Sequence, residues 1–267
     1  MPEALLHKIS AERIDLENPF LPPFFYQQQK AYTFCLQFIK DKSILEIGSG
    51  SGYGTYRLAK VAKNVLGIDS DEIVIKKSKE KYKINNLKFA CSRIEDFKAD
   101  NKFDCVIALQ VFEHIEKPEL FLNKIVSVIA KDGFLIISTP NGQTQSYNEN
   151  PYHYKEYFFG ELKTIFSEYF KEVEFCGLLG DSKVMKFEEM RREHILNILR
   201  MDSFNLRKFI PRRIKQLIFD SIAFLNRVMY QRKNTKSNGK ILEDNYKIIK
   251  GNVPNAIDII AICRYLK

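Results

Sequence analysis

The sequence predicts an α/β fold with a doubly wound, mostly parallel sheet, and two observations support this prediction. The first is a series of short apolar runs, each suited to a buried strand and separated from the next by a segment of helix length. These runs lie at residues 43–47, 64–68, 87–90, 104–109 and 133–138. The second is the stretch ILEIGSGSGYGT, residues 44–55, in which an apolar strand leads directly into four glycines. Glycine lets the backbone turn from strand to helix and approach a ligand closely, so we expect a ligand-binding loop here.

Two further strands bring the predicted total to seven. A helix is expected around 157–169, a strand around 172–178 and a strongly apolar strand at 256–266. Some seventy residues separate these last two strands, so an insertion lies between them. The chain therefore divides into four predicted parts, which are an N-terminal helical cap (1–40), a core (41–180), a basic helical insertion (181–250) and the final strand of the core sheet (251–267).

Composition predicts a soluble, cytoplasmic protein. The chain has 267 residues, of which 45% are hydrophobic and 28% charged, as in ordinary globular proteins. No run approaches the ~18 apolar residues of a membrane-spanning helix, so neither membrane insertion nor a signal peptide is expected. The five cysteines include no C-x-x-C pair and indicate a reducing compartment. With four histidines and no metal-ligand spacing, no metal site is expected.

The spacing of the glycines excludes two common ligands. A dinucleotide fingerprint that began at Gly48 would need glycine where the chain has Tyr53, and a phosphate-binding loop would need a lysine before Lys60. What remains is Glu46-Ile-Gly48-Ser-Gly50-Ser-Gly52, an acidic residue two positions before a G-x-G-x-G turn. This pattern resembles the first motif of class I S-adenosylmethionine-dependent methyltransferases, in which the glycines pass beneath the methionine part of the cofactor. The resemblance implies that Glu46, Gly48, Ser49, Gly50 and Gly52 bind S-adenosylmethionine; the alternative is an ordinary tight strand-to-helix turn.

Three further segments extend the resemblance. FDCVIALQVFEHI (103–115) is similar to the fourth-strand motif of the small-molecule branch, and DGFLIISTPN (132–141) to its fifth strand and exit loop. NPYHYKEYFFGELKTIF (150–166) resembles a segment from a subgroup with many members encoded among surface-polysaccharide and glycosylation genes. The resemblance covers roughly residues 28–178 and the last strand. It implies an antiparallel seventh strand and an enzyme of saccharide or glycolipid biosynthesis.

The second predicted strand supplies a candidate for the ribose of the cofactor. It ends at Asp69, and its tip lies beside the glycine loop in a doubly wound sheet, where a carboxylate can accept both ribose hydroxyl hydrogens. Asp69 is therefore the expected cofactor anchor, with Ser70 next to it. The alternative for Asp69 is the N-cap of the following helix, a role that Ser70 or Asp71 could also fill.

Two positions depart from the family pattern around the cofactor. Relatives often place an acidic residue after the third strand to meet the adenine amino group, but alignment puts Arg93 there, and arginine cannot accept a hydrogen bond. The backbone amide of Ile94 could still bind an adenine nitrogen, and Glu95 or Asp96 could replace the missing acid. Position 110, often acidic in relatives, is Gln110.

Histidines are the candidates for the chemical step. The enzyme must align the acceptor for in-line attack and, for a hydroxyl, remove a proton. His114 and His153 both follow strands at the carboxyl edge, where ligands of such sheets bind, and histidine titrates near neutral pH. We expect His114 to be the general base, with His153 as the reserve or as an acceptor-positioning group. Glu113 either orients His114 or caps the next helix.

Aromatic residues near the histidines are candidates for acceptor binding. Tyr152 and Tyr154 offer rings with hydroxyl tips that suit stacking on a sugar, although such residues also pack a loop against its own helix.

Positive charge is concentrated in the insertion. Residues 183–240 contain fifteen Lys or Arg and five Asp or Glu, a balance of +10, while the whole chain carries +9. An amphipathic helix is expected to begin just after Pro211. One interpretation is a helical cap with solvated basic residues. The other is a lid in which Arg212 and Arg213 bind a phosphate-bearing or lipid-linked acceptor, or the acidic inner face of a membrane.

Several functions remain after these observations. O-methylation of a saccharide or glycolipid-like acceptor leads, followed by N- or C-methylation of another small molecule such as an amino sugar or a quinone. A nucleic-acid methyltransferase is not expected, because the chain has neither an Asn-Pro-Pro-aromatic motif after the fourth strand nor a Pro-Cys pair. A non-catalytic cofactor-binding module is disfavoured by the two histidines.

Overall fold

The structure is a computed structural model that describes residues 23–145, 150–201, 210–211, 214–217, 219 and 240–267. The predicted binding residues Arg212 and Arg213 lie outside these ranges, as does most of the predicted N-terminal cap. Among the described residues, no helix combines the length and the apolar character needed to cross a membrane.

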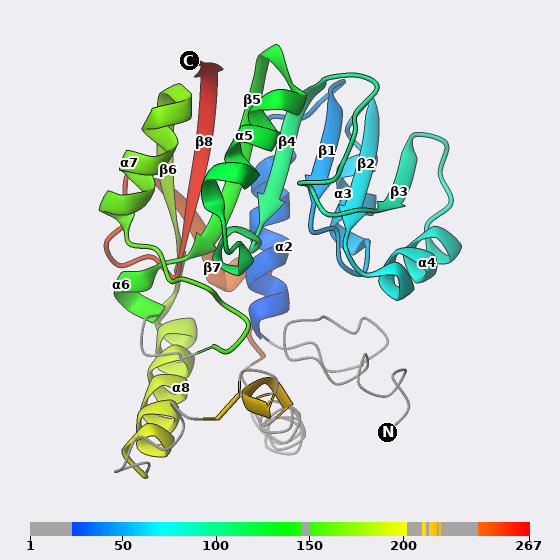
Figure 1. Ribbon diagram of the computed structural model, residues 1–267. Helices are drawn as coiled ribbons and strands as arrows, with labels where there is room; N and C mark the ends of the chain where they lie inside the picture. The colour runs from blue at the N-terminus through cyan, green and yellow to red at the C-terminus, as the bar shows by residue number, and fades with distance from the viewer. Residues whose placement is uncertain (1–22, 146–149, 202–209, 212–213, 218, 220–239) are drawn as a thin grey trace.

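The predicted α/β fold with a doubly wound sheet is confirmed (Figure 1). Eight strands form one sheet in the order β3-β2-β1-β4-β5-β8-β6-β7. Their bounds are β1 (Ser43–Ile47), β2 (Asn64–Asp69), β3 (Leu87–Cys91), β4 (Phe103–Leu109), β5 (Ile129–Pro140), β6 (Phe170–Gly180), β7 (Tyr246–Lys250) and β8 (Asp258–Leu266). The pairs on the β3 side of the sheet, up to β4 with β5, are parallel, whereas β8 is antiparallel to both of its neighbours. The antiparallel last strand agrees with the resemblance noted above.

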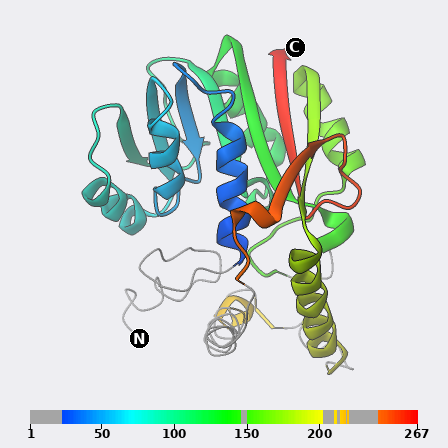
Figure 2. The same ribbon diagram turned by 180° about the vertical axis from the view of Figure 1, so that it is seen from behind.

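Helices cover both faces of the sheet, so the central strands are buried on both sides and read as continuous apolar runs. In Figures 1 and 2, α5 (Pro118–Val128) and α7 (Phe159–Tyr169) lie on one face, and α2 (Pro23–Cys35) and α3 (Tyr53–Ala59) on the other. Each face has its own apolar core: Tyr32, Leu58 and Ile107 belong to one, and Phe112, Phe121 and Phe166 to the other. The remaining helices are α4 (Glu72–Lys81), η1 (Phe112–His114), α6 (Gly142–Gln145), α8 (Ser182–Met201) and η3 (Glu243–Asn245).

The segment predicted as a helical insertion is only partly helical. Within 181–250, α8 is a helix that projects from the carboxyl edge of the sheet (Figures 1 and 2), but Tyr246–Lys250 forms the strand β7. This strand pairs antiparallel with β6 and makes the eighth strand, one more than expected. Its Tyr246 is buried, while Lys250 forms an ion pair with Glu174 on β6 (Nζ to Oε2, 2.6 Å). Lysines at an edge strand limit unwanted pairing with other chains.

Candidate functional site

The glycine loop joins β1 to α3 and is built for close approach of a ligand. Gly48, Gly50 and Gly52 have φ angles of 73°, 51° and 77°, in the left-handed region that other residues enter only with strain. A Cβ built on Gly50 would meet no described atom within 4 Å, whereas one on Gly52 would lie 2.9 Å from both Ser78 and Phe89. The loop therefore packs against the protein at Gly52 and presents open backbone at Gly50.

Glu46 lies beneath this loop with an unsatisfied oxygen. Its side chain is buried, and Oε1 accepts a hydrogen bond of 2.6 Å from the hydroxyl of Tyr32 on α2. Among the described residues, Oε2 of Glu46 and the hydroxyl of Ser49 are buried without a hydrogen-bond partner. Buried polar atoms are nearly always paired, so these two fit a polar ligand group such as the amino acid end of S-adenosylmethionine.

The burial of Glu46 has a measurable consequence for stability. Burial raises its pKa from the ordinary value of 4.5 to about 7, so the folded protein holds this proton more tightly than the unfolded chain does. The resulting stabilisation is full at low pH and is lost as the pH rises through about 7. We expect the free energy of unfolding, relative to that of Glu46→Gln, to fall by about 2 to 3 kcal/mol between about pH 5 and 8. Chemical denaturation across this range checks it, and a pH-independent difference would contradict it.

Asp69, at the end of β2, lies beside the glycine loop. Its Oδ2 accepts from the backbone N–H of Gly50 (2.9 Å) and its Oδ1 from that of Asp71 (3.0 Å). The helix-capping alternative for Asp69 is wrong, because the side chain of Asp71 caps α4 by accepting from Ile73 and Val74. Each carboxylate oxygen has a second lone pair, so Asp69 keeps acceptor capacity for a ribose. Ser70 is exposed next to it.

On the predicted adenine side of the site, Arg93 forms an ion pair with a neighbouring glutamate. Arg93 is exposed and its Nε lies 3.5 Å from Oε2 of Glu95, while Ile94 is buried. The backbone N–H of Ser92 donates to the carbonyl of Asp69 (2.9 Å), which ties this loop to the end of β2. Arg93 and Glu95 therefore form an ion pair with each other. The roles predicted for both residues in binding adenine stay predictions.

The chain turns sharply after β4. Gln110 has a φ angle of 55°, and its backbone N–H donates to the carbonyl of Ser138 on β5 (3.0 Å). A left-handed conformation at a residue other than glycine carries strain and is often found at functional sites. This turn leads into η1, which carries Glu113 and His114 at the carboxyl edge of the sheet.

Glu113 is held in the protein interior. Only 1% of its surface is exposed, its Oε2 accepts from the hydroxyl of Thr139 (3.0 Å), and its carbonyl accepts from the N–H of Tyr154 (2.7 Å). The capping alternative is wrong for Glu113, because the N-cap of the next helix, α5, is Lys117. Its Oε1 lies 4.0 Å from Nε2 of His114, beyond hydrogen-bond length, so its predicted orienting role stays a prediction.

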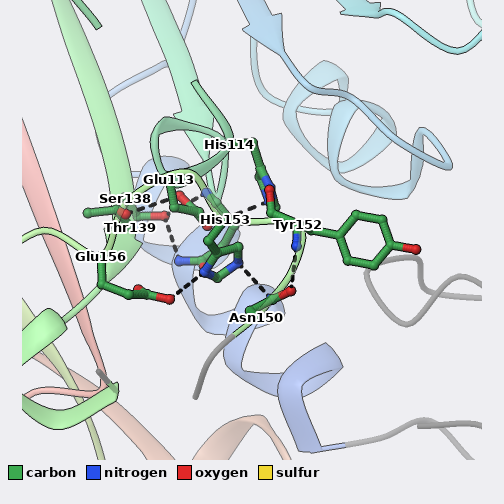
Figure 3. Close-up of polar contacts among 9 residues, drawn as sticks. Glu113, His114, Ser138, Thr139, Asn150, Tyr152, His153 and Glu156 are labelled. Carbon is green, nitrogen blue, oxygen red and sulfur yellow. Dashed lines mark hydrogen bonds and ion pairs between the residues drawn. The ribbon is translucent and has the colours of Figure 1, made fainter. Parts of the chain in front are cut away.

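The structure brings the two predicted histidines together (Figure 3). The rings of His114 and His153 meet edge to face with their centroids 4.8 Å apart. Nδ1 of His114 lies 3.1 Å from the carbonyl oxygen of Tyr152, and Nδ1 of His153 lies 2.6 Å from Oε1 of Glu156. Both partners accept, so in each ring Nδ1 carries a hydrogen, and Nε2 carries the lone pair when the ring is neutral. Nε2 of His153 is 2.9 Å from Nδ2 of Asn150.

The two candidate tyrosines contribute mainly through their backbones. The ring of Tyr152 points away from the histidines (Figure 3) and packs against Phe219, with centroids 6.3 Å apart. Tyr154 is half exposed, and its backbone N–H donates a hydrogen bond to the carbonyl of Glu113. Asn150, Glu156 and Tyr32, for which the sequence carries no pattern, form hydrogen bonds to the candidate residues.

A polar network at the same edge was also missed. Nε2 of Gln27 on α2 donates to Oδ2 of Asp258 at the start of β8 (2.6 Å), and burial raises the pKa of Asp258 to about 7. On α8, Arg191 forms an ion pair with Glu188 (3.1 Å) and donates to Oε1 of Gln145 (2.6 Å). Gln27 and Asp258 lie far apart in the sequence, as do Gln145 and Arg191, so no short spacing pattern connects the two members of either pair.

Comparison with known proteins yields related sequences over the core. Residues 39–189 match a family model described as a methyltransferase domain. The chain is 29% identical over 178 residues to a probable S-adenosylmethionine-dependent methyltransferase of Mycobacterium tuberculosis, a match that covers 62% of this chain and 60% of that protein. It is 34% identical over 114 residues to a ubiquinone biosynthesis O-methyltransferase of Rickettsia bellii, covering 41% and 46% of the two chains. The chain thus matches about 60% of the length of the first of these relatives.

Solved structures share the fold. A possible histamine N-methyltransferase from Thermotoga maritima superposes with a TM-score of 0.55 at 13% identity, covering 91% of this chain and 92% of that one. The N-methyltransferase NodS from Bradyrhizobium japonicum, in complex with S-adenosylhomocysteine, gives a TM-score of 0.51 at 20% identity, covering 65% and 87%. At these identities the likeness concerns the fold alone.

Proposed function

Because this chain belongs to the methyltransferase-domain family, which its match over residues 39–189 shows, we propose that it transfers a methyl group from S-adenosylmethionine to a hydroxyl group of a saccharide or glycolipid-like acceptor. The observation that carries this proposal is the cluster of Glu113, His114 and His153 at the carboxyl edge of the sheet. The glycine loop after β1 ends at the same edge, so cofactor and acceptor would meet there.

Residues of this chain would bind two parts of the cofactor, its methionine part and its ribose. Glu46 and the backbone at Gly50 would hold its methionine part, and Asp69 would accept the ribose hydroxyls. When bound, S-adenosylmethionine supplies a methyl group already activated on a sulfonium sulfur. The protein therefore needs to align the acceptor and to handle its proton.

Proton removal is assigned to the histidine cluster. The acceptor oxygen forms a bond to the methyl carbon while the carbon–sulfur bond breaks, S-adenosylhomocysteine leaves, and the hydroxyl proton departs at the cluster. Nε2 of His114 is the assigned base because the carbonyl of Tyr152 keeps the hydrogen on Nδ1. His153 is the reserve, with its Nδ1 fixed by Glu156.

The polar network at the sheet edge favours an acceptor rich in hydroxyl groups. Gln27, Asp258, Glu188 and Arg191 supply amide, carboxylate and guanidinium groups around the start of β8 and along α8. Asp258 and Glu188 are buried within this network, so its partly buried members, Gln27 and Arg191, are the ones that would donate to the hydroxyls of a saccharide. The alternative acceptor is another small molecule methylated on nitrogen or carbon, such as an amino sugar or a quinone.

Acceptor class is tested with product mass and linkage. The protein is incubated with S-adenosylmethionine and a panel of saccharides, amino sugars, quinones and a nucleic acid. We expect a product heavier by one methylene unit with a new methyl ether on a sugar. A methyl group found on the amino sugar nitrogen or on a quinone, with none on a saccharide hydroxyl, would favour the alternative and contradict the proposal.

We also propose a role for the positive charge of the insertion. Ile214 and Lys215 donate backbone hydrogen bonds to the carbonyl of Pro211 (3.0 and 3.1 Å), which supports the expectation of a helix that begins near this residue. Cations in a first turn oppose the helix dipole, and an anion beside them would offset this cost. Arg212, Arg213 and Lys215 would bind a phosphate of a lipid-linked or nucleotide-linked acceptor. The protein would then be a cytoplasmic enzyme that works at the inner face of the membrane.

The charge proposal predicts a salt-sensitive Michaelis constant. Changing Arg212, Arg213 and Lys215 to glutamine should raise the KM for a phosphate-bearing acceptor by roughly 3- to 10-fold. The phosphate would lose about two ion pairs, each weakened by exposure to solvent and salt. The wild-type KM should itself rise with salt. The matched control is the same acceptor without its phosphate, for which KM should be equal in both proteins. A KM indifferent to the substitutions and to salt would leave the cluster without a role in acceptor binding.

A further inference from the structure

We propose that Glu113, His114 and His153 bind one divalent transition-metal cation. Each residue offers a ligand atom, and the three atoms lie within 4.8 Å of one another. Ligand atoms around a tetrahedral ion with bonds of about 2.0 to 2.2 Å are about 3.3 Å apart. Small side-chain rotations would therefore bring the three atoms onto a common ion, with no change of the strands that carry them.

The hydrogen bonds of the two imidazoles are those of metal ligands. A ligating histidine almost always donates its second ring N–H to a carboxylate or a backbone carbonyl, which fixes the ring and makes the ligating nitrogen more basic. Here Nδ1 of His114 faces the carbonyl of Tyr152 at 3.1 Å, and Nδ1 of His153 faces the carboxylate of Glu156 at 2.6 Å. In both rings Nε2 is therefore the nitrogen that remains for a cation.

One existing contact must give way to the cation. Nδ2 of Asn150 lies 2.9 Å from Nε2 of His153, while its Oδ1 accepts from the N–H of Tyr152 (3.0 Å). The hydrogen bond to Tyr152 fixes which end of the amide faces the histidine. The cation would replace Asn150 as the partner of Nε2, and the second hydrogen bond of Asn150 would remain.

Burial and charge favour a dication at this position. Glu113 is 1% exposed, its Oε2 accepts from Thr139, and its Oε1 lies 4.0 Å from Nε2 of His114. Glu156, behind His153, adds a second carboxylate within the same cluster. Buried carboxylates are stable when they are paired with cations. A ligand set of two imidazoles and one carboxylate suits Zn²⁺, Co²⁺, Mn²⁺ or Fe²⁺ and leaves coordination positions open.

This site differs from the expectation of no metal, because its ligands follow no short spacing in the sequence. Glu113 and His114 are adjacent on η1, but His153 comes after β5 and its exit loop. The return of the chain to the same edge of the sheet creates the cluster, and the polar partners that orient it come from the segment 150–156 (Figure 3).

The role of the cation rests on the proposed function. A divalent ion lowers the pKa of a hydroxyl group that coordinates to it. The acceptor hydroxyl would lose its proton to bulk water, its oxygen would bond to the methyl carbon, and the sulfur would keep the electron pair of the broken carbon–sulfur bond. In the metal-free protein Nε2 of His114 would be the direct base, as in the proposed function, and with the cation bound His114 would promote loss of the same proton as a ligand of the cation.

Binding of Co²⁺ alone tests the site without cofactor or acceptor. The full-length protein is stripped with a chelator and titrated with Co²⁺, with visible absorption and elemental analysis as the two readouts. We expect one Co²⁺ per chain, and an affinity at least roughly 10-fold weaker in His114→Ala and in His153→Ala. His7→Ala and His194→Ala are the matched controls and should bind like the wild type. Failure of the wild type to bind Co²⁺, or equal binding by all four variants, would overturn the proposal.

A conservative variant of Glu156 tests the site without removing a histidine, so that a loss of Co²⁺ binding is not mistaken for a loss of folding. Glu156→Gln keeps the volume of the side chain and removes only the charge behind His153, so it should fold normally and bind Co²⁺ roughly 10- to 100-fold more weakly. Wild-type affinity in this variant would contradict the role given to Glu156 as the group that orients a ligand. The thermal melt of every variant, recorded without metal, shows whether folding has been retained.

Metal binding and methyl transfer can fail separately. If saccharide methylation proceeds at full rate in the chelated protein and Co²⁺ does not bind, the metal proposal is wrong and the proposed function stands. If Co²⁺ binds at the cluster and no hydroxyl is ever methylated, the metal site stands and the proposed function is wrong.

Discussion

His114→Ala should lower the turnover number by about 10² to 10⁴, the usual effect of removing a positioned group that handles a proton. The ring of His114 is fixed by the carbonyl of Tyr152 and meets His153 edge to face, so alanine removes its Nε2 without disturbing a strand. Affinity for S-adenosylmethionine should stay near the wild-type value, because the proposed cofactor residues Glu46 and Asp69 lie on other strands, β1 and β2. Steady-state kinetics with the identified acceptor, together with calorimetry of cofactor binding, measures both quantities.

The companion variant His153→Ala decides between the two histidines. An inactive His153→Ala beside an active His114→Ala would exchange their roles. Full activity in both variants would show that the acceptor needs no group from this cluster, as expected for an amine, and would remove the observation on which O-methylation rests.

Asp69→Ala should weaken binding of S-adenosylmethionine by about 1.5 to 3 kcal/mol, or roughly 10- to 150-fold in Kd. The ribose would lose its hydrogen bonds to the carboxylate. The glycine loop would lose the oxygen that accepts from the N–H of Gly50 at 2.9 Å. Asp69→Asn retains one acceptor oxygen and should fall between wild type and alanine. Calorimetry on the three proteins measures the series.

Asp71→Ala is the matched control for this prediction. It makes the same chemical change two residues away, at the cap of α4, and should cost about 1 kcal/mol of stability without changing cofactor affinity. Equal cofactor affinities in Asp69→Ala and wild type would remove Asp69 from the site.

Much of the sheet could be predicted because buried parallel strands leave a local signal. The expected run 43–47 coincides with β1, and 104–109 lies within β4, since both strands are covered on two faces and must be apolar throughout. The edge strand β7 could not be predicted, because it is largely exposed and so has no continuous apolar run. It has five residues, two of them lysines, and only Tyr246 is fully buried, so its pattern was too weak to distinguish from the surrounding insertion.

The candidate site could be predicted in its residue types and only partly in its contacts. Glu113, His114 and His153 were identifiable because they follow strands at the carboxyl edge. Their partners were not, because the carbonyl of Tyr152 and the carboxylate of Glu156 reach the histidines through the path of one loop. Likewise, Tyr32 and Glu46 are 14 residues apart on a helix and a strand, and only the packing of α2 on the sheet brings their oxygens to 2.6 Å.

The central claim is that the glycine loop and the histidine cluster form a single site. A crystal structure of the protein with S-adenosylhomocysteine measures this most directly. The account predicts that the ribose hydroxyls contact Asp69, that the amino acid end lies against Glu46, and that the sulfur faces His114 and His153. A cofactor product bound away from the glycine loop, or bound there with its sulfur turned from the histidines, would contradict it.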